Sequence, residues 1–270
     1  MFKQLLFFVA LFSCTHAFAA DGSSESKQTT LLDDFYVNVI SIVHGPGVNN
    51  LDQPYTPNAD GKTVPKATSA MNFDSELTAA YMITDTVGVG PDVPFLAYPV
   101  LGKGFSLGDV GIKAFDKKFI SNSALAVYAN IIFQLPTSDY SSGRDMSFAI
   151  KMTPNLRYII ADTRFMVGVW TEEKAYMGVN AGKTAKLYAQ PYVNYQVTHK
   201  FSWNLGFEAE ADHFYGKPNF DLTMYQTDLM PGFVYVVTPK LIVNPYFQVF
   251  TSQKVSLNNT ALGAFLSASL

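Results

Sequence analysis

A six-residue pattern recurs four times along the chain, as YMITDT (81–86), YIIADT (158–163), YQVTHK (195–200) and YVVTPK (235–240). Each copy begins with tyrosine, has an aliphatic third residue and is followed by a segment that alternates between apolar and polar residues. Short polar stretches bounded by alternating segments are typical of tight hairpin turns. The four tyrosines lie 77, 37 and 40 residues apart, and a divergent turn at 116–123 lies near the middle of the first interval. A tight turn is therefore predicted about every 40 residues.

The segments between these turns have one apolar and one polar face. In 123–135, one face carries Leu125, Val127, Ala129, Ile131, Phe133 and Leu135, and the other carries Tyr128, Asn130 and Gln134. The same alternation runs through 146–160, 186–197 and 241–249, and it predicts β-strands. Strands of this length exceed the usual length of about five or six residues and match the roughly 9–11 residues that cross a bilayer at a tilt.

Twelve strands are predicted, with short turns at one end and longer loops at the other. An even number of antiparallel strands in this arrangement is typical of an outer-membrane barrel with both termini on the periplasmic side. The strand at 87–98 has the weakest pattern, because GPDVPFLAYP contains three prolines. The first loop, at about 45–70, is the longest. The predicted strands are 34–44, 71–83, 87–98, 105–115, 123–135, 146–160, 164–172, 186–197, 201–213, 222–237, 241–250 and 260–270.

A secreted, soluble β-sandwich or lipocalin-like barrel is the alternative fold, because alternation alone does not show which face points inward. Strand length, a tyrosine at a fixed distance before each turn and a low charge content favour the membrane barrel. Charged residues make up only 15% of the chain, against about a quarter in soluble domains. We therefore predict an all-β fold, namely a transmembrane, antiparallel, up-and-down β-barrel of about twelve strands in the outer membrane of a Gram-negative bacterium.

The first nineteen residues have the features of a secretory signal peptide. One lysine is followed by an apolar run from Leu5 to Phe12, and the Ala-Phe-Ala sequence at 17–19 predicts cleavage after Ala19. A lipoprotein-like sequence at 11–14 is a rival, and it would place a lipid on Cys14. Cleavage after Ala19 leaves 20–270 as the barrel domain, without any cysteine. Beyond the signal, no apolar run reaches the ~18 residues that a membrane helix requires.

The tyrosines that open the turn pattern are expected to lie at one height in the barrel wall. This is the placement of an aromatic girdle at a membrane interface. The predicted girdle residues are Tyr81, Tyr158, Tyr195, Tyr235 and, on a strand that leaves one of the turns, Trp203. The chain also ends inside a strand, with Leu262, Ala264, Leu266, Ala268 and Leu270 on one face. That end resembles the C-terminal signal through which outer-membrane barrels engage their assembly machinery, although the usual last residue is Phe.

The inner face of the predicted barrel carries charges of both signs. A Lys or Arg that faces lipid near the midplane costs about 2–4 kcal/mol, so these groups are expected to point inward. Twelve strands about 4.8 Å apart and tilted by about 40° enclose a backbone cylinder roughly 24 Å across. The candidate lumen-lining residues are the acids Asp74, Glu76, Asp109, Glu208, Glu210 and Asp212, the cations Lys113, Lys151 and Arg157, and the polar ladder Tyr188, Tyr192 and Asn194.

Two functions fit such an interior. The first is a narrow, water-filled passive channel for small solutes, with a mild cation preference from the acidic excess. The second is a structural or surface-interaction barrel whose lumen is closed by ion pairs. The acids at 208–212 either guide a solute or only balance Lys113, Lys151 and Arg157. Outer-membrane lipid and the assembly machinery are the expected partners in both cases.

Other function classes have little support in the sequence. His44, His199 and His213 are the histidines that follow the signal, and none has a serine that we identify as a partner on the lipid-facing wall. Catalysis requires a base within reach of its nucleophile, so we predict no enzyme activity and assign no catalytic residue. Neither a metal-ligand cluster nor a phosphate-binding glycine loop is found, so no metal and no cofactor are expected. The net charge of −3 gives no basic face for nucleic acid.

Two segments resemble a known family. SLGDVGIKAF (106–115) and NIIFQLPTSDYSSG (130–143) are similar to the outer-membrane barrels grouped as the MetA pathway of phenol degradation family. The matching residues are Gly108-Asp109 and the Pro-Thr-Ser-Asp sequence at 136–139, with Ser138 in place of an expected Gly and Ser106 in place of the first Gly. The resemblance covers about 40 residues closely. It implies a barrel that transports small molecules, including hydrophobic or aromatic ones, and it transfers no catalytic residue.

Overall fold

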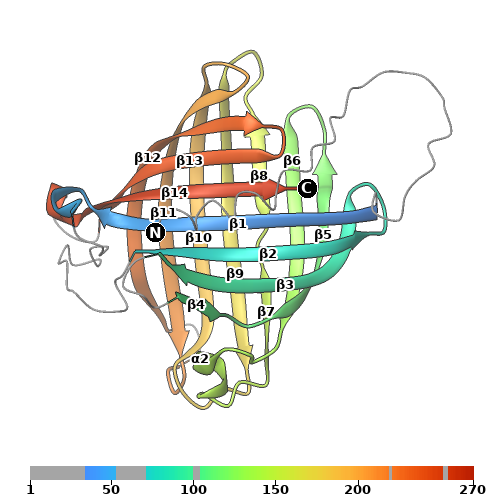
Figure 1. The fold of residues 1–270 in the computed structure, drawn as a ribbon, viewed down its shortest axis with the longest axis vertical. Helices are drawn as coiled ribbons and strands as arrows, with labels where there is room; N and C mark the ends of the chain where they lie inside the picture. Colours follow the sequence, from blue (N-terminus) through green and yellow to red (C-terminus); the bar gives the residue numbers. More distant parts are fainter. Residues whose placement is uncertain (1–33, 53–70, 100–103, 219–220, 252–254) are drawn as a thin grey trace.

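The computed structural model describes residues 34–52, 71–99, 104–218, 221–251 and 255–270 (Figure 1). The predicted signal peptide 1–19, Cys14 and residues 53–70 of the first loop lie outside these ranges. In the described part, fourteen strands are joined by turns and by three short helices. The helices are η2 (Val48–Asn50), α2 (Asp139–Ser142) and η4 (Leu257–Asn259). No helix among the described residues has the length and apolar character needed to cross a membrane.

The strands form one continuous antiparallel sheet. They are β1 (Phe35–Gly47), β2 (Asn72–Met82), β3 (Val87–Tyr98), β4 (Gly104–Leu107), β5 (Gly111–Ser121), β6 (Leu125–Gln134), β7 (Phe148–Met152), β8 (Asn155–Ile159), β9 (Phe165–Met177), β10 (Lys183–Gln196), β11 (Phe201–Phe214), β12 (Leu222–Thr238), β13 (Leu241–Phe250) and β14 (Thr260–Ser269). Each strand pairs with its neighbours in sequence, apart from the two interruptions described below. The first and last strands also pair, with Asn38 opposite Ser269 and Val43 opposite Ala264.

This last pairing closes the sheet into a barrel, as the ribbon shows (Figure 1). β4 and β5 lie in line against β3, and β7 and β8 lie in line between β6 and β9. The described strand segments therefore make twelve barrel positions. The prediction of an all-β, closed, antiparallel barrel of twelve strands is confirmed. Closure removes the unpaired strand edges that would otherwise promote aggregation.

Two strands that were predicted as continuous are interrupted. The segment 105–115 breaks at 108–110, and the segment 146–160 breaks at Thr153 and Pro154. At the second break, Pro154 has no backbone N–H to donate to the ladder. The Pro154 carbonyl still accepts a hydrogen bond from Thr171 N of β9 at 3.1 Å. This bond holds the connection between β7 and β8 against β9. The next strand, predicted to end at 172, continues to Met177.

The predicted tight turns lie between the expected strands. Their threonines explain the pattern, because a threonine hydroxyl can accept backbone N–H groups and close a turn locally. The Thr84 hydroxyl accepts from Val87 N at 3.0 Å, and the Thr198 hydroxyl accepts from Phe201 N at 3.0 Å. In the copy at 158–163 the hydroxyl of Thr163 accepts from Phe165 N at 3.1 Å. The divergent turn is shorter than predicted, because β5 extends to Ser121 through a register shift after Asp116.

The two faces of the barrel wall differ in polarity. Large apolar side chains are exposed on the outer face, including Ile131 and Phe133 on β6 and Leu205 and Phe207 on β11. On the inner face of the same strands, Asn130, Gln134 and Gly206 are buried. This inversion of the soluble pattern is what a barrel surrounded by lipid requires.

Several aromatic rings inside the barrel lie against glycines of neighbouring strands. Tyr246 on β13 is directly opposite Gly232 on β12 and Gly263 on β14. A Cβ atom on Gly263 would lie 2.4 Å from the Tyr246 ring, which is far inside van der Waals contact. Tyr192 lies over Gly168 in the same way. The glycines have no side chain, so these rings can pack directly against the backbone of the neighbouring strands.

Candidate functional site: the barrel interior

The charged faces of the strands meet inside the barrel. Glu76 on β2 contacts both Lys113 on β5 and Lys151 on β7. Strands β3, β5 and β6 separate β2 from β7, so the contact between Glu76 and Lys151 crosses the interior. The face that carries these residues is therefore the inner face, and alternation along each strand assigns the remaining residues to one side or the other.

The first group of charges is the Glu76 cluster, which consists of Glu76, Asp92, Lys113 and Lys151. Lys113 Nζ lies 2.5 Å from Glu76 Oε1 and 3.4 Å from Asp92 Oδ1, and Lys151 Nζ lies 2.6 Å from Glu76 Oε2. The Thr78 hydroxyl donates to Asp92 Oδ1 at 3.0 Å. Both lysines and Asp92 are buried. Buried charges are tolerated only when they are paired and hydrogen-bonded, and the two carboxylates satisfy the two ammonium groups here.

The second group is the Lys183–Lys186 cluster, which also contains Glu172, Glu210 and Asp212. Lys183 Nζ lies 2.6 Å from Asp212 Oδ2 and 3.2 Å from Glu210 Oε1. Lys186 Nζ lies 3.2 Å from Glu210 Oε2 and 3.3 Å from Glu172 Oε1. Two of the three acids at 208–212 are therefore paired with lysines of the adjacent strand β10, and not with the three cations that the sequence suggested.

The third acid, Glu208, belongs to a different arrangement. It lies opposite Asp228 in the register of β11 and β12. The Gln226 amide donates to Glu208 Oε1 at 3.5 Å and also to Asp228 Oδ2, and the Gln248 amide donates to Asp228 Oδ2 at 2.5 Å. Among the described residues, no basic side chain forms an ion pair with Glu208 or Asp228 within 4.0 Å. The hydrogen-bond partners of these two acids are neutral groups.

The polar ladder that was predicted on β10 makes hydrogen bonds to the adjacent strand β11 and, across β9, to β8. The Tyr188 hydroxyl lies 3.0 Å from Glu208 Oε2, and the Tyr192 hydroxyl donates to Asn155 Oδ1 at 3.0 Å. Asn194 accepts from the Asn204 amide at 2.6 Å. The ladder therefore connects β8, β10 and β11 on the inner face. Whether these residues contact a solute stays a prediction.

Asp109 fixes a loop to the barrel wall. One carboxylate oxygen accepts from Ser138 N at 3.2 Å and from the Ser138 hydroxyl at 2.7 Å, and the other accepts from the Ser141 hydroxyl at 2.6 Å. Lys174 Nζ lies 3.7 Å away. The Thr137 hydroxyl donates to the Gly108 carbonyl at 3.0 Å. The two segments that resemble the known family are thus in direct contact, and they hold the loop that contains α2.

Two predicted lumen residues lie apart from the clusters. Asp74 on β2 is exposed and lies opposite Ile42 and Leu96 in the register of its neighbours. Arg157 on β8 is exposed and lies opposite Ala126 and Gly168. Both occupy inner-face positions by strand alternation, and neither forms an ion pair with another described residue within 4.0 Å.

The predicted girdle residues are all exposed beside the short turns. They are Tyr81, Tyr158, Tyr195, Trp203 and Tyr235. Two of them make ring contacts with aromatic neighbours, since the Tyr195 and Phe165 centroids lie 4.9 Å apart and the Tyr81 and Phe35 centroids lie 5.9 Å apart. Their location at a membrane interface stays a prediction.

Several charged residues of the interior were not predicted from the sequence. They are Asp92, Glu172, Lys174, Lys183, Lys186 and Asp228. Lys186 and Asp228 lie within predicted strands, and alternation from Tyr188 and from Gln226 would have placed both on the inner face. Residues 172–174 are Glu-Glu-Lys, all charged, so no alternation of apolar and polar residues shows which of them face inward.

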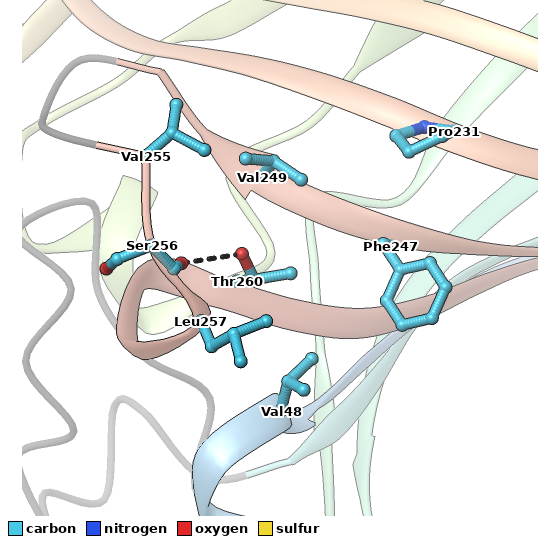
Figure 2. A pocket seen from close by; sticks show the side chains of 8 residues that line it. All are labelled: Val48, Pro231, Phe247, Val249, Val255, Ser256, Leu257 and Thr260. Carbon is cyan, nitrogen blue, oxygen red and sulfur yellow. Dashed lines mark hydrogen bonds between the residues drawn. The ribbon is translucent and has the colours of Figure 1, made fainter.

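A shallow apolar groove lies on the outer side of the wall (Figure 2). Its volume is about 460 Å³. Pro231, Phe247 and Val249 of β12 and β13 form one side, and Val255 and Leu257 of the last loop form another. Val249 lies opposite Leu229, which is an exposed residue of the outer face. The groove is therefore separate from the charged interior.

The barrel is similar in fold to a known outer-membrane channel. The structure is similar to that of the COG4313 outer membrane channel from Pseudomonas putida F1, with a TM-score of 0.52, 12% sequence identity, and coverage of 93% of this chain and 100% of that one. It is more distantly similar to the NanC porin, with a TM-score of 0.46, 8% identity, and coverage of 86% and 98%. At this identity the first similarity shows a shared fold.

No protein-family model matches the sequence, and no curated protein matches it either. The resemblance to the MetA-pathway family therefore stays a prediction. The coarser statement, that the chain folds as an outer-membrane type of barrel, does not depend on it.

Proposed function

We propose that the protein is an outer-membrane channel through which small solutes pass passively. The observation that carries the proposal is the inverted polarity of the wall, with large apolar side chains exposed outside and charged side chains meeting inside. A polar interior of this kind is characteristic of barrels that enclose a water-filled path. The shared fold with a protein described as an outer membrane channel supports it. No catalytic step and no cofactor are part of the proposal.

Part of the inner wall supports a solute with an apolar or aromatic portion. On the side formed by β13, β14 and β1, the inner positions include Ile40, Ile42, Tyr246 and Phe265, which are partly exposed. Ile42 lies directly opposite Phe265 across the seam that closes the barrel. The clusters of ion pairs lie on the other strands. A solute that passes would meet apolar side chains on one side and charged groups on the other.

A closed, structural barrel is the second candidate function. It is favoured by the burial and pairing of the Glu76 cluster, whose contact between β2 and β7 crosses the interior. In such a barrel the loops would contact partners and the lumen would not conduct.

Conductance in a planar lipid bilayer separates the two candidates. The purified, refolded protein is expected to give discrete current steps in 1 M KCl, and its reversal potential in a KCl gradient is expected to favour the cation. Heat-modifiable migration on a gel provides the control that the inserted protein is folded. A folded barrel that gives no current above the lipid baseline would contradict the channel proposal and favour the closed barrel.

The location and the partners belong to the same proposal. We expect the chain to be recovered from outer membranes with detergent, with its outer face in contact with lipid. We expect assembly to depend on β14, which pairs with β1 and closes the sheet. Recovery of the native chain from the periplasm without detergent would count against the membrane location.

A further inference from the structure

We propose that the loop between β6 and β7, residues 135–147, is a constriction loop that lies on the inner face of the barrel and limits the size of the solutes that pass. The loop begins after Gln134, at the end of the barrel opposite the tight turns, and it returns to the wall at Phe148. It contains α2. The inference rests on the proposed function, because a constriction matters only in a lumen that conducts.

The register of the strands shows that the wall beneath this loop is the inner face. Lys151 on β7 points inward, because it contacts Glu76 across the interior. Alternation along β7 therefore places Ala149 on the inner face as well. Ala149 lies directly opposite Gln134 on β6 and opposite Tyr176 on β9. These three residues form one row on the inner face, close to the end of the barrel.

This row is covered. Ala149 has 0% relative exposure and Gln134 has 1%. Ala149 packs with Met146 of the loop and with Val179, which lies between β9 and β10, and Tyr176 packs against this apolar cluster. Inner-face residues beside a water-filled mouth would be exposed. The loop therefore occupies part of the interior at this end of the barrel.

Asp109 attaches the loop to the wall on one side. Its carboxylate accepts from the hydroxyls of Ser138 and Ser141 at 2.7 and 2.6 Å. The same carboxylate lies 3.7 Å from Lys174 Nζ on β9. Lys174 points inward, because it lies opposite Lys151 in the register of β7 and β9. Strands β6 and β7 separate Asp109 from β9, so the groups that hold the loop meet over the inner face.

Arg144 attaches the loop on the other side. Its Nη1 donates to the Lys183 carbonyl, at the start of β10, at 2.8 Å. Its guanidinium lies over the rings of Tyr140 and Tyr176, at 4.1 and 4.8 Å from their centroids. Arg144 is buried, and cation–π contacts are stronger when they are shielded from water. The contacts of the loop thus extend from the position of β4 and β5, across β6, β7 and β9, to β10.

The loop removes cross-section that water and solutes would otherwise use. Twelve strands enclose a backbone cylinder roughly 24 Å across, and side chains on both walls already take part of that space. The contacts of the loop span five consecutive positions of the twelve-position barrel, so it adds a second layer of chain over a large part of the wall. The narrowest part of a pore determines which solutes pass. The attachments at Asp109 and Arg144 therefore set the size limit by holding the loop in place.

The test compares the single-channel current of the refolded wild type with that of Asp109→Ala in 1 M KCl. At this salt concentration the screening length is about 3 Å, so a change in current reports the cross-section rather than the lost charge. Asp109→Ala removes the acceptor of both serine hydroxyls, and its current is expected to be at least twofold higher. Asp139→Asn is the matched control. It removes an exposed acid of the same loop and should leave the current unchanged.

A second measurement tests the size limit itself. The swelling of proteoliposomes gives the relative entry rates of arabinose and sucrose. The ratio of the sucrose rate to the arabinose rate is expected to rise at least threefold in Asp109→Ala, because a wider path favours the larger sugar most. A faster variant with an unchanged ratio would show general leakage and would overturn the constriction loop.

Folding of each variant is checked by the gel migration of unheated samples. If Asp109→Ala does not fold, the double variant Ser138→Ala/Ser141→Ala decides. It removes the hydroxyl donors on the loop and leaves the barrel wall unaltered, and the same increase in current is expected.

The outcomes separate the loop from the proposed channel. If the wild type and Asp109→Ala conduct equally, the constriction loop is overturned and the channel proposal stands. If the wild type gives no current and Asp109→Ala conducts, the loop is kept as the barrier and the passive channel is overturned. No current from either folded protein would overturn both.

Discussion

Glu76→Gln is expected to destabilise the barrel, because one carboxylate neutralises two buried lysines. Lys113 retains Asp92 at 3.4 Å, whereas Glu76 is the acid paired with Lys151 in the described structure. Removing one partner of a buried ion pair costs about 3–5 kcal/mol, since the other charge is left buried and unpaired. The Glu76 side chain is 19% exposed, so water screens part of the interaction. We expect the free energy of unfolding to fall by about 2–3 kcal/mol.

The measurement is urea unfolding of the barrel in lipid vesicles, followed by the fluorescence of Trp170 and Trp203. The double variant Glu76→Gln/Lys151→Met also removes the stranded charge and is expected to recover at least half of the loss. Asp85→Asn, an exposed acid in the turn after β2, is the control and should change stability by less than about 0.5 kcal/mol. A Glu76→Gln protein as stable as the wild type would refute the reasoning, and so would a double variant as unstable as the single one.

Three further predictions concern the loop, the inner wall and the outer wall. Asp109→Ala should free the loop that contains α2, so that tryptic cleavage after the buried Arg144 becomes at least tenfold faster in timed digests; an unchanged rate would show that other contacts hold the loop. Gly263→Ala should cost about 1–3 kcal/mol in urea unfolding, because the new Cβ would lie 2.4 Å from an aromatic ring, and an unaffected midpoint would mean that the ring moves freely. Leu205→Arg on the outer face should cost about 2–4 kcal/mol in lipid, whereas Asn204→Arg on the inner face should cost much less; equal costs would contradict the assignment of faces.

The regular parts of the fold could be predicted because they depend on local sequence. Thr84 and Thr198 close their turns through hydrogen bonds to residues three positions away, so a short pattern contains the whole interaction. The faces of β6 follow from alternation, since Ile131 and Phe133 are exposed and Gln134 is buried. Turn chemistry and period-two alternation were therefore sufficient for the number and order of barrel strands.

The pairing of charges could not be predicted, because it depends on how the barrel closes. Lys151 meets an acid that is 75 residues away in sequence and four barrel positions away in space. Lys183 and Lys186 were overlooked near the start of β10, and they pair with Glu210 and Asp212. The sequence shows which residues point inward, but the relative heights of distant strands decide which of them come into contact.

The run Glu172-Glu173-Lys174 shows where alternation stops being informative. All three residues are charged, and in β9 they alternate between the inner and outer faces. Outside the lipid band a strand can carry charges on both sides without a large penalty. The sequence prediction ended this strand at 172, and it missed Lys174 beyond that point.

The contact between Tyr246 and its two glycines has a consequence for how the barrel is assembled. Gly232, Tyr246 and Gly263 form one row across β12, β13 and β14. Apart from Phe265, the inner face of β14 carries small residues such as Ser267, and hydrogen bonds alone would allow the last strand to slide by two residues. Such a slide would bring Phe265 or Ala261 beneath the tyrosine ring and cause a collision. The Tyr246 ring therefore prevents β14 from shifting along β13 and fixes the register of the closing strand. This register determines the stagger of the strands, which sets the barrel's diameter.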